Sequence, residues 1–282
     1  MNSSPRVRSS LQEFDHLADR LRQHRQVHDG PVLIVEGSDD LLVLRDHISV
    51  DVSIFPANGR KNAITTAKTL LHWGFTDFVC VTDHDFDQPV AVADIAEVHY
   101  PYDRRDLESM LVTLGVLAAV LDHQGSQTKI ATLGGSGALV QRIEEQVEPV
   151  TRLRAHNAQQ NLGLAFDEVD LANKVDRTFL SLAVESYCAA LVNASEAPIS
   201  AKDALRITDA PYENLLGHAG KDTIAVAGVS LRKLAGTLEK AATAEPQLSA
   251  QVRSSAGLAL AQSDWLRGLL HRLNSLGGSS NQ

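Results

Sequence analysis

The chain has 282 residues, of which 44% are hydrophobic and 22% charged, and its formal net charge is −9. This composition is typical of a globular protein with a substantial core. An acidic chain also argues against binding nucleic acid through bulk charge alone. The acidic excess is concentrated: residues 30–108 contain 14 acidic and 6 basic side chains, a balance of −8, which leaves −1 for the other 203 residues. The excess of acidic residues in this segment therefore needs a specific explanation.

Several classes of protein are excluded early. The only cysteines, Cys80 and Cys188, are far apart in the sequence, which argues against a disulfide scaffold, a zinc finger or an iron–sulfur site. Residues 1–17 lack the apolar stretch of a signal peptide. The longest apolar run, at 110–121, is too short to cross a bilayer. We therefore expect a cytoplasmic protein that does not associate with membranes.

The first part of the chain reads as helix and then as alternating strands and helices. Apolar spacing predicts a helix over 10–27, so residues 1–29 form an N-terminal helical segment. Strands are predicted at 31–37, 50–56, 77–82 and 97–100, and helices at 39–48, 61–73 and 106–123. This order predicts an α/β core over 30–123 with a mostly parallel sheet, whose ligands bind outside the carboxyl ends of the strands.

The strand signal fades after residue 123. Residues 124–282 are predicted to form a mainly helical C-terminal region, with a loop at 124–137, a loop or short strand at 162–171, and helices at 139–157, 175–194, 222–242 and 249–276. The apolar positions of the last helix fit either a core face or a dimer interface. We expect the protein to form a homo-oligomer.

Carboxylates follow three of the predicted strands. Glu36 ends the first strand, Asp83, Asp85 and Asp87 follow the third, and Glu108 lies in the helix after the fourth. Because parallel strands end at one edge of a sheet, these groups should converge, and crowded carboxylates repel unless a cation neutralises them. Oxygen ligands favour Mg²⁺, with Mn²⁺ as a substitute, and such ions suit phosphoryl chemistry. Each carboxylate also has an ordinary interpretation as a helix cap or turn residue.

Three short motifs occur in a particular order: Val35-Glu36-Gly37 with Asp40 four residues after the glutamate, then Asn58-Gly59, then Asp83-x-Asp85. The first and last resemble the TOPRIM domain of topoisomerases, primases and OLD nucleases. The Asn-Gly loop, together with the later Asp106-Leu107-Glu108, resembles a narrower stand-alone TOPRIM group that includes AriB, the effector of the PARIS antiphage system. The resemblance covers about residues 31–112 and is faint at 216–222. It implies a TOPRIM (Rossmann-like) fold and a metal-dependent phosphodiesterase.

The resemblance also implies roles for particular residues. Glu36, Asp83 and Asp85 would be catalytic. The residues that it would place at the metal are Glu36, Asp40, Asp83, Asp85 and Glu108. Asp87 is a further predicted metal ligand because it continues the Asp-x-Asp-x-Asp pattern after the third predicted strand. Basic side chains near the same edge of the sheet could contact the nucleic acid, namely Arg60, Lys61, Arg104 and Arg105. Lys61 is the first choice for a catalytic phosphate contact, because it would open a helix beside the strand ends.

We therefore expect a Mg²⁺-dependent endonuclease that acts in antiphage defence on RNA, with tRNA as one candidate, or on DNA. An AAA- or ABC-type ATPase is a potential partner. The alternative is a non-catalytic TOPRIM-fold subunit of such an ATPase complex, against which the intact Glu36, Asp83 and Asp85 argue. A phosphatase of the haloacid-dehalogenase type fits less well, because that class carries its Asp-x-Asp on the first strand. Strand passage is not expected, since the chain is too short for the other topoisomerase domains.

Overall fold

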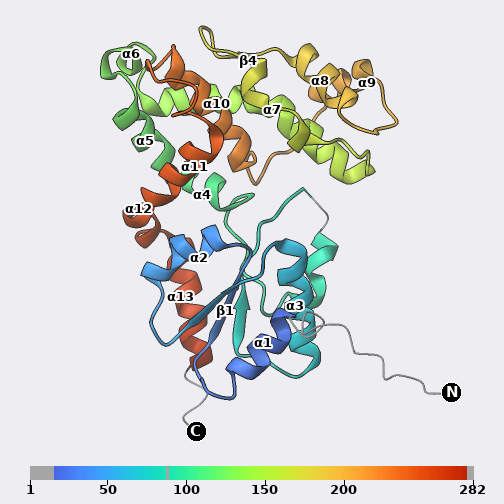
Figure 1. Cartoon of the computed structure of the whole chain (residues 1–282), viewed down its shortest axis with the longest axis vertical. Helices are drawn as coiled ribbons and strands as arrows, with labels where there is room; N and C mark the ends of the chain where they lie inside the picture. The colour runs from blue at the N-terminus through green and yellow to red at the C-terminus, as the bar shows by residue number, and fades with distance from the viewer. Residues whose placement is uncertain (1–15, 87–88, 278–282) are drawn as a thin grey trace, which may run out of the picture. The chain divides into compact units, whose positions relative to one another are not determined.

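A computed structural model describes residues 16–86 and 89–277 of the chain. The protein is mixed α/β and 58% helical, and the chain divides into two compact units (Figure 1). Unit 1 comprises Met1–Thr82, Val92–Tyr100 and Gly268–Gln282, and unit 2 comprises Asp83–Ala91 and Pro101–Arg267. These units differ from the predicted division at 29/30 and 123/124, because residues 1–29 belong to the same unit as the sheet and residues 101–123 belong to unit 2. The C-terminal segment from Gly268 also belongs to unit 1.

Unit 1 is built on a parallel sheet of three strands in the order β2-β1-β3. The strands are β1 (Val32–Val35), β2 (Ser53–Pro56) and β3 (Phe78–Cys80), and in the register Ile34 pairs with both Phe55 and Cys80. The central strand β1 is apolar and fully buried, as expected for a parallel strand covered on both faces. The predicted fourth strand is reduced to a single parallel bridge between Cys80 and His99.

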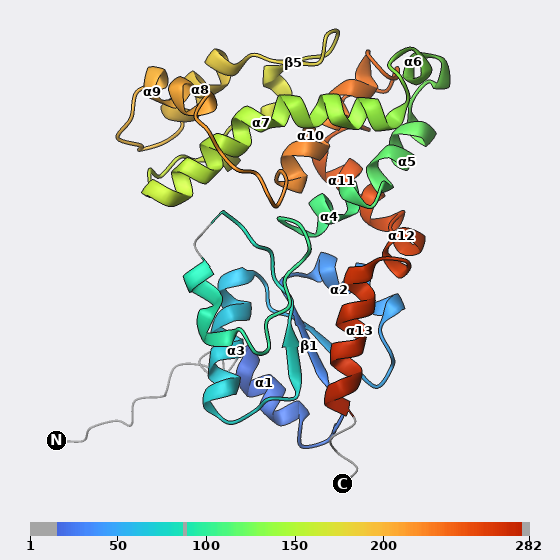
Figure 2. The same ribbon diagram turned by 180° about the vertical axis from the view of Figure 1, so that it is seen from behind.

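Helices cover both faces of this sheet. They are α1 (Leu17–His24), α2 (Ser38–Leu44), α3 (Arg60–His72) and the part of α13 (Asp264–Gly277) that belongs to unit 1. The 3-10 turn η2 (Arg45–His47) and the end of η3 (Pro89–Ile95), from Val92 onward, also belong to this unit. One side of the sheet carries α1 and α3, and the other carries α2 and α13 (Figures 1 and 2). Val32 and Ile34 pack with Leu21 of α1 and Leu70 of α3 in one buried cluster. Since strand side chains alternate, Leu33 and Val35 point to the other layer.

Unit 2 is mainly helical. Its elements are α4 (Leu107–Thr113), α5 (Val116–Gln124), α6 (Gln127–Thr132), α7 (Ser136–Gln160), η4 (Phe166–Glu168), η5 (Leu171–Lys174), the antiparallel pair β4 (Val175–Asp176) and β5 (Ser181–Leu182), α8 (Val184–Asn193), α9 (Ala201–Thr208), α10 (Gly220–Arg232), α11 (Glu245–Ser254) and α12 (Gly257–Ala261). Eleven of the 13 residues of α10 are buried, so this helix is central to the core of unit 2.

The sequence correctly predicted that unit 2 is mainly helical, but several of the predicted helix ends differ from those of the structure. The helix predicted at 106–123 is two helices separated at Leu114-Gly115, and the one predicted at 249–276 is α11, α12 and part of α13. Apolar spacing continues through such breaks because both segments bury one face. The loop predicted at 124–137 contains α6, and the helix predicted at 175–194 starts with the β4–β5 hairpin. Two-residue strands are too short to show an alternating pattern.

Two further helices are shorter than the sequence predicted. The helix predicted at 222–242 ends at Arg232, and α1 occupies Leu17–His24 of the helix predicted at 10–27. The beginning of that predicted helix, up to residue 15, lies outside the described residues. Across the parts of the chain that the structure describes, we find no helix with the length and apolar character needed to cross a membrane.

Candidate functional site

Glu36 directly follows β1 and lies at the carboxyl edge of the unit 1 sheet. Its carbonyl oxygen accepts a hydrogen bond from the Gly59 N–H at 2.8 Å, and the Val35 carbonyl accepts one from the Ala57 N–H at 2.9 Å. These two hydrogen bonds hold the loop after β2 against the end of β1. Asn58 and Gly59 have φ values of 58° and 115°, in the region that glycine, and to a lesser extent asparagine, adopts more readily than other residues. This backbone path explains the Asn-Gly pair.

The same loop delivers the first turn of α3 to this edge. The helix begins at Arg60, directly after Gly59, and Lys61 is exposed at its second position. The unsatisfied N–H groups and the dipole at a helix N-terminus favour a negative group, and Lys61 adds a full positive charge. Unit 1 therefore holds Glu36, Arg60 and Lys61 at one edge of its sheet.

Cys80 of β3 is an unreactive neighbour of this edge. Burial, with a further contribution from the negative charge of Glu36, raises the pKa of the Cys80 thiol to about 12. A thiol with such a pKa stays protonated at neutral pH and is a poor nucleophile. The chemistry available at this edge is therefore that of oxygen and nitrogen groups.

Asp40 has a structural role at the start of α2. Its Oδ2 atom accepts a hydrogen bond from the Gly37 N–H at 2.8 Å, and the residue is 8% exposed. A carboxylate at the third helical position that reaches back to the residue before the helix forms half of a capping box. Metal binding by Asp40 stays a prediction, and the cap is an alternative reason for its presence.

The backbone after β3 runs beside the backbone after β1. The Val81 N–H donates to the Ile34 carbonyl at 2.8 Å, so the pairing of β1 and β3 continues beyond the residues assigned to β3. Extending the register by two residues brings Glu36 level with Thr82, and Asp83 is the next residue along the chain. Glu36 and the Asp83-x-Asp85 segment thus follow neighbouring strand ends.

Within unit 2, Arg105 forms hydrogen bonds with the backbone of the two residues that follow Asp83. Its carbonyl accepts a hydrogen bond from the His84 N–H at 2.8 Å, and its guanidinium donates to the Asp85 carbonyl at 2.5 Å. The guanidinium carbon also lies 3.8 Å from the centre of the Phe86 ring. Asp85 itself has a φ of 47°, which aspartate tolerates better than most residues. Asp87, predicted as a metal ligand, lies outside the described residues.

The two arginines that precede Glu108 differ in their surroundings. Arg105 is 4% exposed and also donates to the Gly217 carbonyl at 3.1 Å and to the Tyr212 hydroxyl at 3.2 Å. These contacts favour an internal role over the nucleic-acid contact that the sequence predicted. Arg104 is partly exposed and donates to Thr113 Oγ1 at 3.2 Å; it lines a pocket of about 330 Å³.

Asp106 connects α4 to the first residue of α10 through hydrogen bonds. As the N-cap of α4 it accepts a hydrogen bond from the Ser109 N–H at 2.7 Å, and its other oxygen accepts one from the Gly220 N–H at 2.8 Å. Burial raises the pKa of Asp106 to about 6, although these hydrogen bonds oppose the shift. A Cβ atom at Gly220 would lie 2.3 Å from the Glu108 Cβ atom, so the close approach requires glycine. The two late segments of the TOPRIM resemblance, 106–108 and 216–222, therefore contact each other.

Glu108, predicted as a metal ligand, is paired with a basic side chain of unit 2. Its Oε1 atom lies 2.6 Å from Nη1 of Arg253, and the side chains are 20% and 19% exposed. This ion pair is an alternative reason for the carboxylate. No local pattern could reveal it, because 145 residues separate the two partners.

A second ion pair of unit 2 was also missed by sequence reasoning. Arg154 donates to Asp222 through two hydrogen bonds of 2.6 and 2.9 Å, and both side chains are largely buried. Burial lowers the pKa of Arg154, but the negative charge of Asp222 outweighs this and the pKa is raised. The bidentate geometry keeps both groups charged. Only a resemblance at Lys221-Asp222 pointed to this segment.

A metal ion would find oxygen donors at the carboxyl edge of the sheet, in keeping with the preference of Mg²⁺. Among residues 16–86 and 89–277, no group of three or more His, Cys, Asp and Glu side chains is close enough to hold a metal ion. Glu36 belongs to unit 1, whereas Asp83, Asp85 and Glu108 belong to unit 2. Metal binding by these residues therefore stays a prediction.

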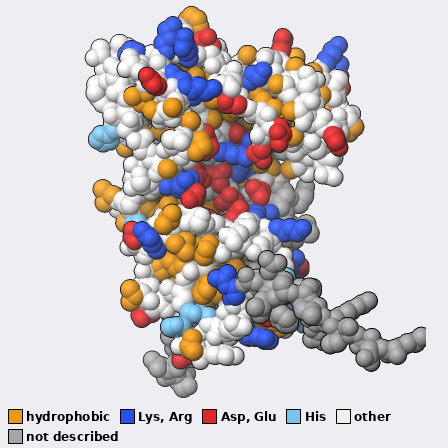
Figure 3. Space-filling model, in the orientation of Figure 1, with side chains coloured by type: hydrophobic (Ala, Val, Ile, Leu, Met, Phe, Trp, Pro, Cys, Tyr) orange, Lys and Arg blue, Asp and Glu red, His pale blue; other side chains and the backbone are white. Residues whose placement is uncertain are grey.

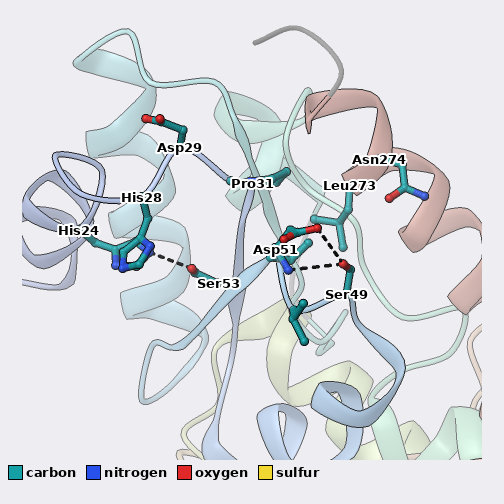
Figure 4. A pocket seen from close by; sticks show the side chains of 12 residues that line it. His24, His28, Asp29, Pro31, Ser49, Asp51, Ser53, Leu273 and Asn274 are labelled. Atoms are coloured by element: carbon teal, nitrogen blue, oxygen red, sulfur yellow. Dashed lines mark hydrogen bonds between the residues drawn. The ribbon is translucent and has the colours of Figure 1, made fainter. Parts of the chain in front are cut away.

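A pocket of about 640 Å³ in unit 1 lies at the opposite edge of the sheet, where β1 and β2 begin (Figure 4). His24 and His28 stack there with ring centres 4.4 Å apart, and His24 Nε2 lies 2.8 Å from Ser53 Oγ. Burial, followed by the positive charges of His28 and Arg25, lowers the pKa of His24. Ligands of parallel α/β sheets bind at the carboxyl ends of the strands, so this pocket is separate from the predicted site.

No protein-family model, curated protein or solved structure matches the chain significantly. The TOPRIM resemblance therefore rests on the order and spacing of the sequence motifs alone. On the face drawn in Figure 3, lysine and arginine side chains stand among acidic and hydrophobic ones. Any nucleic-acid contact on that face would accordingly be local.

Proposed function

We propose that the protein is a metal-dependent nuclease of the TOPRIM type that hydrolyses phosphodiester bonds. One observation carries this proposal: Glu36 and the Asp83-x-Asp85 segment follow the ends of two neighbouring parallel strands. The carboxyl ends of such strands are the usual position of a ligand site in an open α/β sheet. The first turn of α3, with Lys61, lies at the same edge as Glu36 and supports binding of a phosphate group.

Each residue has a chemical task in this proposal. The carboxylates of Glu36, Asp83 and Asp85 would hold Mg²⁺ or Mn²⁺, and Lys61 would contact the scissile phosphate. Such an ion would supply activation of water and electrostatic stabilisation of the phosphoryl oxygens. Bound cations would also balance part of the acidic excess of residues 30–108. Asp40, Asp87 and Glu108 are further ligands in the proposal, in competition with the cap of Asp40 and the ion pair of Glu108.

The substrate and setting follow from the TOPRIM resemblance. We infer a nucleic-acid substrate, with RNA, including tRNA, preferred over DNA, and a role as an effector of antiphage defence. An AAA- or ABC-type ATPase would be the partner that controls the nuclease, and the nuclease would act as a homo-oligomer. A cytoplasmic location suits this role.

Cleavage assays test the proposal directly. Purified protein is incubated with plasmid, single-stranded DNA and total tRNA in Mg²⁺, Mn²⁺ or EDTA, beside Glu36→Gln and Asp83→Asn. Asp51→Asn is the matched control, because Asp51 lies at the opposite edge of the sheet. We expect cleavage with either metal that EDTA and both site variants abolish and the control retains. Cleavage that persists in EDTA, or in both site variants, contradicts the proposal.

The alternative is a non-catalytic TOPRIM-fold subunit that acts by contacting an ATPase. The Glu108–Arg253 ion pair favours it, because it engages a carboxylate that the nuclease proposal uses. Expression in cells distinguishes the two functions. A nuclease effector is toxic when triggered and loses its toxicity in Glu36→Gln, whereas a binding subunit keeps its effect in that variant.

A further inference from the structure

One face of α3 carries an uninterrupted series of exposed polar and basic side chains. Lys61, Thr65, Lys68 and His72 are all exposed, and their spacing of four, three and four residues places them on one side of the helix. The opposite side, which includes Ala63, Ala67 and Leu70, packs into the core of unit 1. No acidic residue occurs within α3. The charged side chains that α3 itself contributes to this face are therefore all basic, although residues 30–108 as a whole are acidic.

This basic face begins at the edge where Glu36 lies. Gly59, which precedes α3, donates its N–H to the Glu36 carbonyl, so Lys61 is at the Glu36 end and His72 is at the far end of the helix. At 1.5 Å per residue the face extends about 16 Å. That length is about the rise of five nucleotides in one strand of a helical duplex.

An aromatic ring lies at the far end of the face. Trp73 follows α3 and is 42% exposed, and the guanidinium carbon of Arg22 in α1 lies 5.1 Å from the centre of its ring. An exposed aromatic ring beside an arginine is the combination on which unpaired bases stack. The chain has only 13 aromatic residues, and Trp73 is one of the few large hydrophobic side chains that are exposed among the described residues.

The acidic partners of this face are weak competitors for a phosphate. Lys68 pairs with Asp94 at 2.8 Å, and the two side chains are 41% and 71% exposed. Arg22 lies 3.7 Å from Asp19. Exposed pairs of this kind contribute little and are screened by salt, so a polyanion can displace the carboxylates.

We propose that the α3 face, defined as Lys61, Thr65, Lys68 and His72 with Trp73 and Arg22 at its far end, binds a single-stranded nucleic acid and leads it to Glu36. The lysines contact phosphates along the strand, and a base stacks on Trp73. The proposal rests on the proposed nuclease function for the reaction at the Glu36 end. The binding step itself needs no metal and no catalysis.

Binding is measured in EDTA by fluorescence anisotropy, with a labelled single-stranded 20-mer of RNA and one of DNA. The test variant is Lys61→Gln/Lys68→Gln, and the control is Lys202→Gln/Lys240→Gln, which removes the same charge from exposed positions of unit 2. We expect the test variant to bind at least fivefold more weakly and the control to bind within twofold of wild type. The slope of log K against log[salt] should also be about 1.4 smaller in magnitude for the test variant than for wild type, because two phosphate contacts are lost.

Two more variants separate stacking and catalysis from charge. Trp73→Ala should weaken binding at least fivefold, whereas Trp73→Phe should retain most of it. Glu36→Gln should bind as well as wild type in EDTA, so failure of the nuclease proposal and failure of this one are distinguishable. Equal affinities of the test and control variants for both 20-mers, or a duplex bound in preference to them, would overturn the proposal.

Discussion

Gly220→Ala is expected to destabilise unit 2 strongly, because no space exists for a side chain at this position. An added Cβ atom would lie 2.3 Å from the Glu108 Cβ atom, 2.6 Å from Asp106 Oδ1 and 2.8 Å from the Ser109 backbone nitrogen. Overpacking of this kind costs about 1–3 kcal/mol. Moving α10 away also weakens the Asp106 cap of α4, which is worth about 1 kcal/mol. We therefore expect a loss of about 2–4 kcal/mol in the free energy of unfolding.

Urea unfolding followed by far-ultraviolet circular dichroism measures this loss. The control is Gly137→Ala in α7, where an added Cβ atom meets nothing within 4 Å and alanine should stabilise the helix by up to about 1 kcal/mol. The two substitutions add the same methyl group to a glycine within a helix, with opposite expected signs. Surface substitutions usually change the free energy of unfolding by no more than about 0.5 kcal/mol. A Gly220→Ala protein whose free energy of unfolding lies within that range of the wild-type value refutes the reasoning.

The free energy of unfolding of the wild-type protein should fall by about 3 kcal/mol between about pH 4 and pH 7 because of Asp106. In the folded protein its carboxyl group has a pKa of about 6 and keeps a proton that the unfolded chain loses near the ordinary value of 3.8. Urea unfolding of Asp106→Asn at each pH should lack this decrease, and parallel pH curves for the two proteins would contradict the prediction. Asp222→Ala should lower the free energy of unfolding by about 3–5 kcal/mol in the same assay, because it leaves the Arg154 guanidinium buried without its partner. A decrease below about 1 kcal/mol would show that water reaches the guanidinium. Gly59→Ala should cost about 1–3 kcal/mol through backbone strain alone, since φ is 115° and an added Cβ atom meets nothing within 4 Å; an unchanged unfolding midpoint would show that the loop relaxes.

The core of unit 1 could be predicted from sequence because its signals are local. The apolar run of β1, the Asn-Gly break after β2 and the buried positions of α3 each occupy a few consecutive residues, and the parallel sheet follows from their order. The return of α13 to unit 1 has no such signal, since its apolar face fits any core. The β4–β5 hairpin was missed because two residues per strand cannot establish a period.

The sequence predicted which residues of the candidate site follow strand ends, but it did not predict the side-chain partners that are distant in the chain. The position of Glu36 beside the start of α3 follows from a parallel sheet. The pairing of Glu108 with Arg253, and of Asp106 with Gly220, joins residues more than 100 positions apart. Arg105 looks like an exposed basic residue in the sequence, yet burial and four internal contacts distinguish it from Lys61.

Metal binding by Glu36 and Asp83 is the central claim, and Mn²⁺ titration monitored by electron paramagnetic resonance tests it most directly. The signal of free Mn²⁺ gives the bound fraction without any requirement for a substrate, a trigger or a partner. We predict that wild type and Asp51→Asn bind Mn²⁺ with equal affinity, and that Glu36→Gln and Asp83→Asn each bind it at least tenfold more weakly while unfolding at the wild-type urea concentration. Equal Mn²⁺ affinity in all four proteins would contradict the claim.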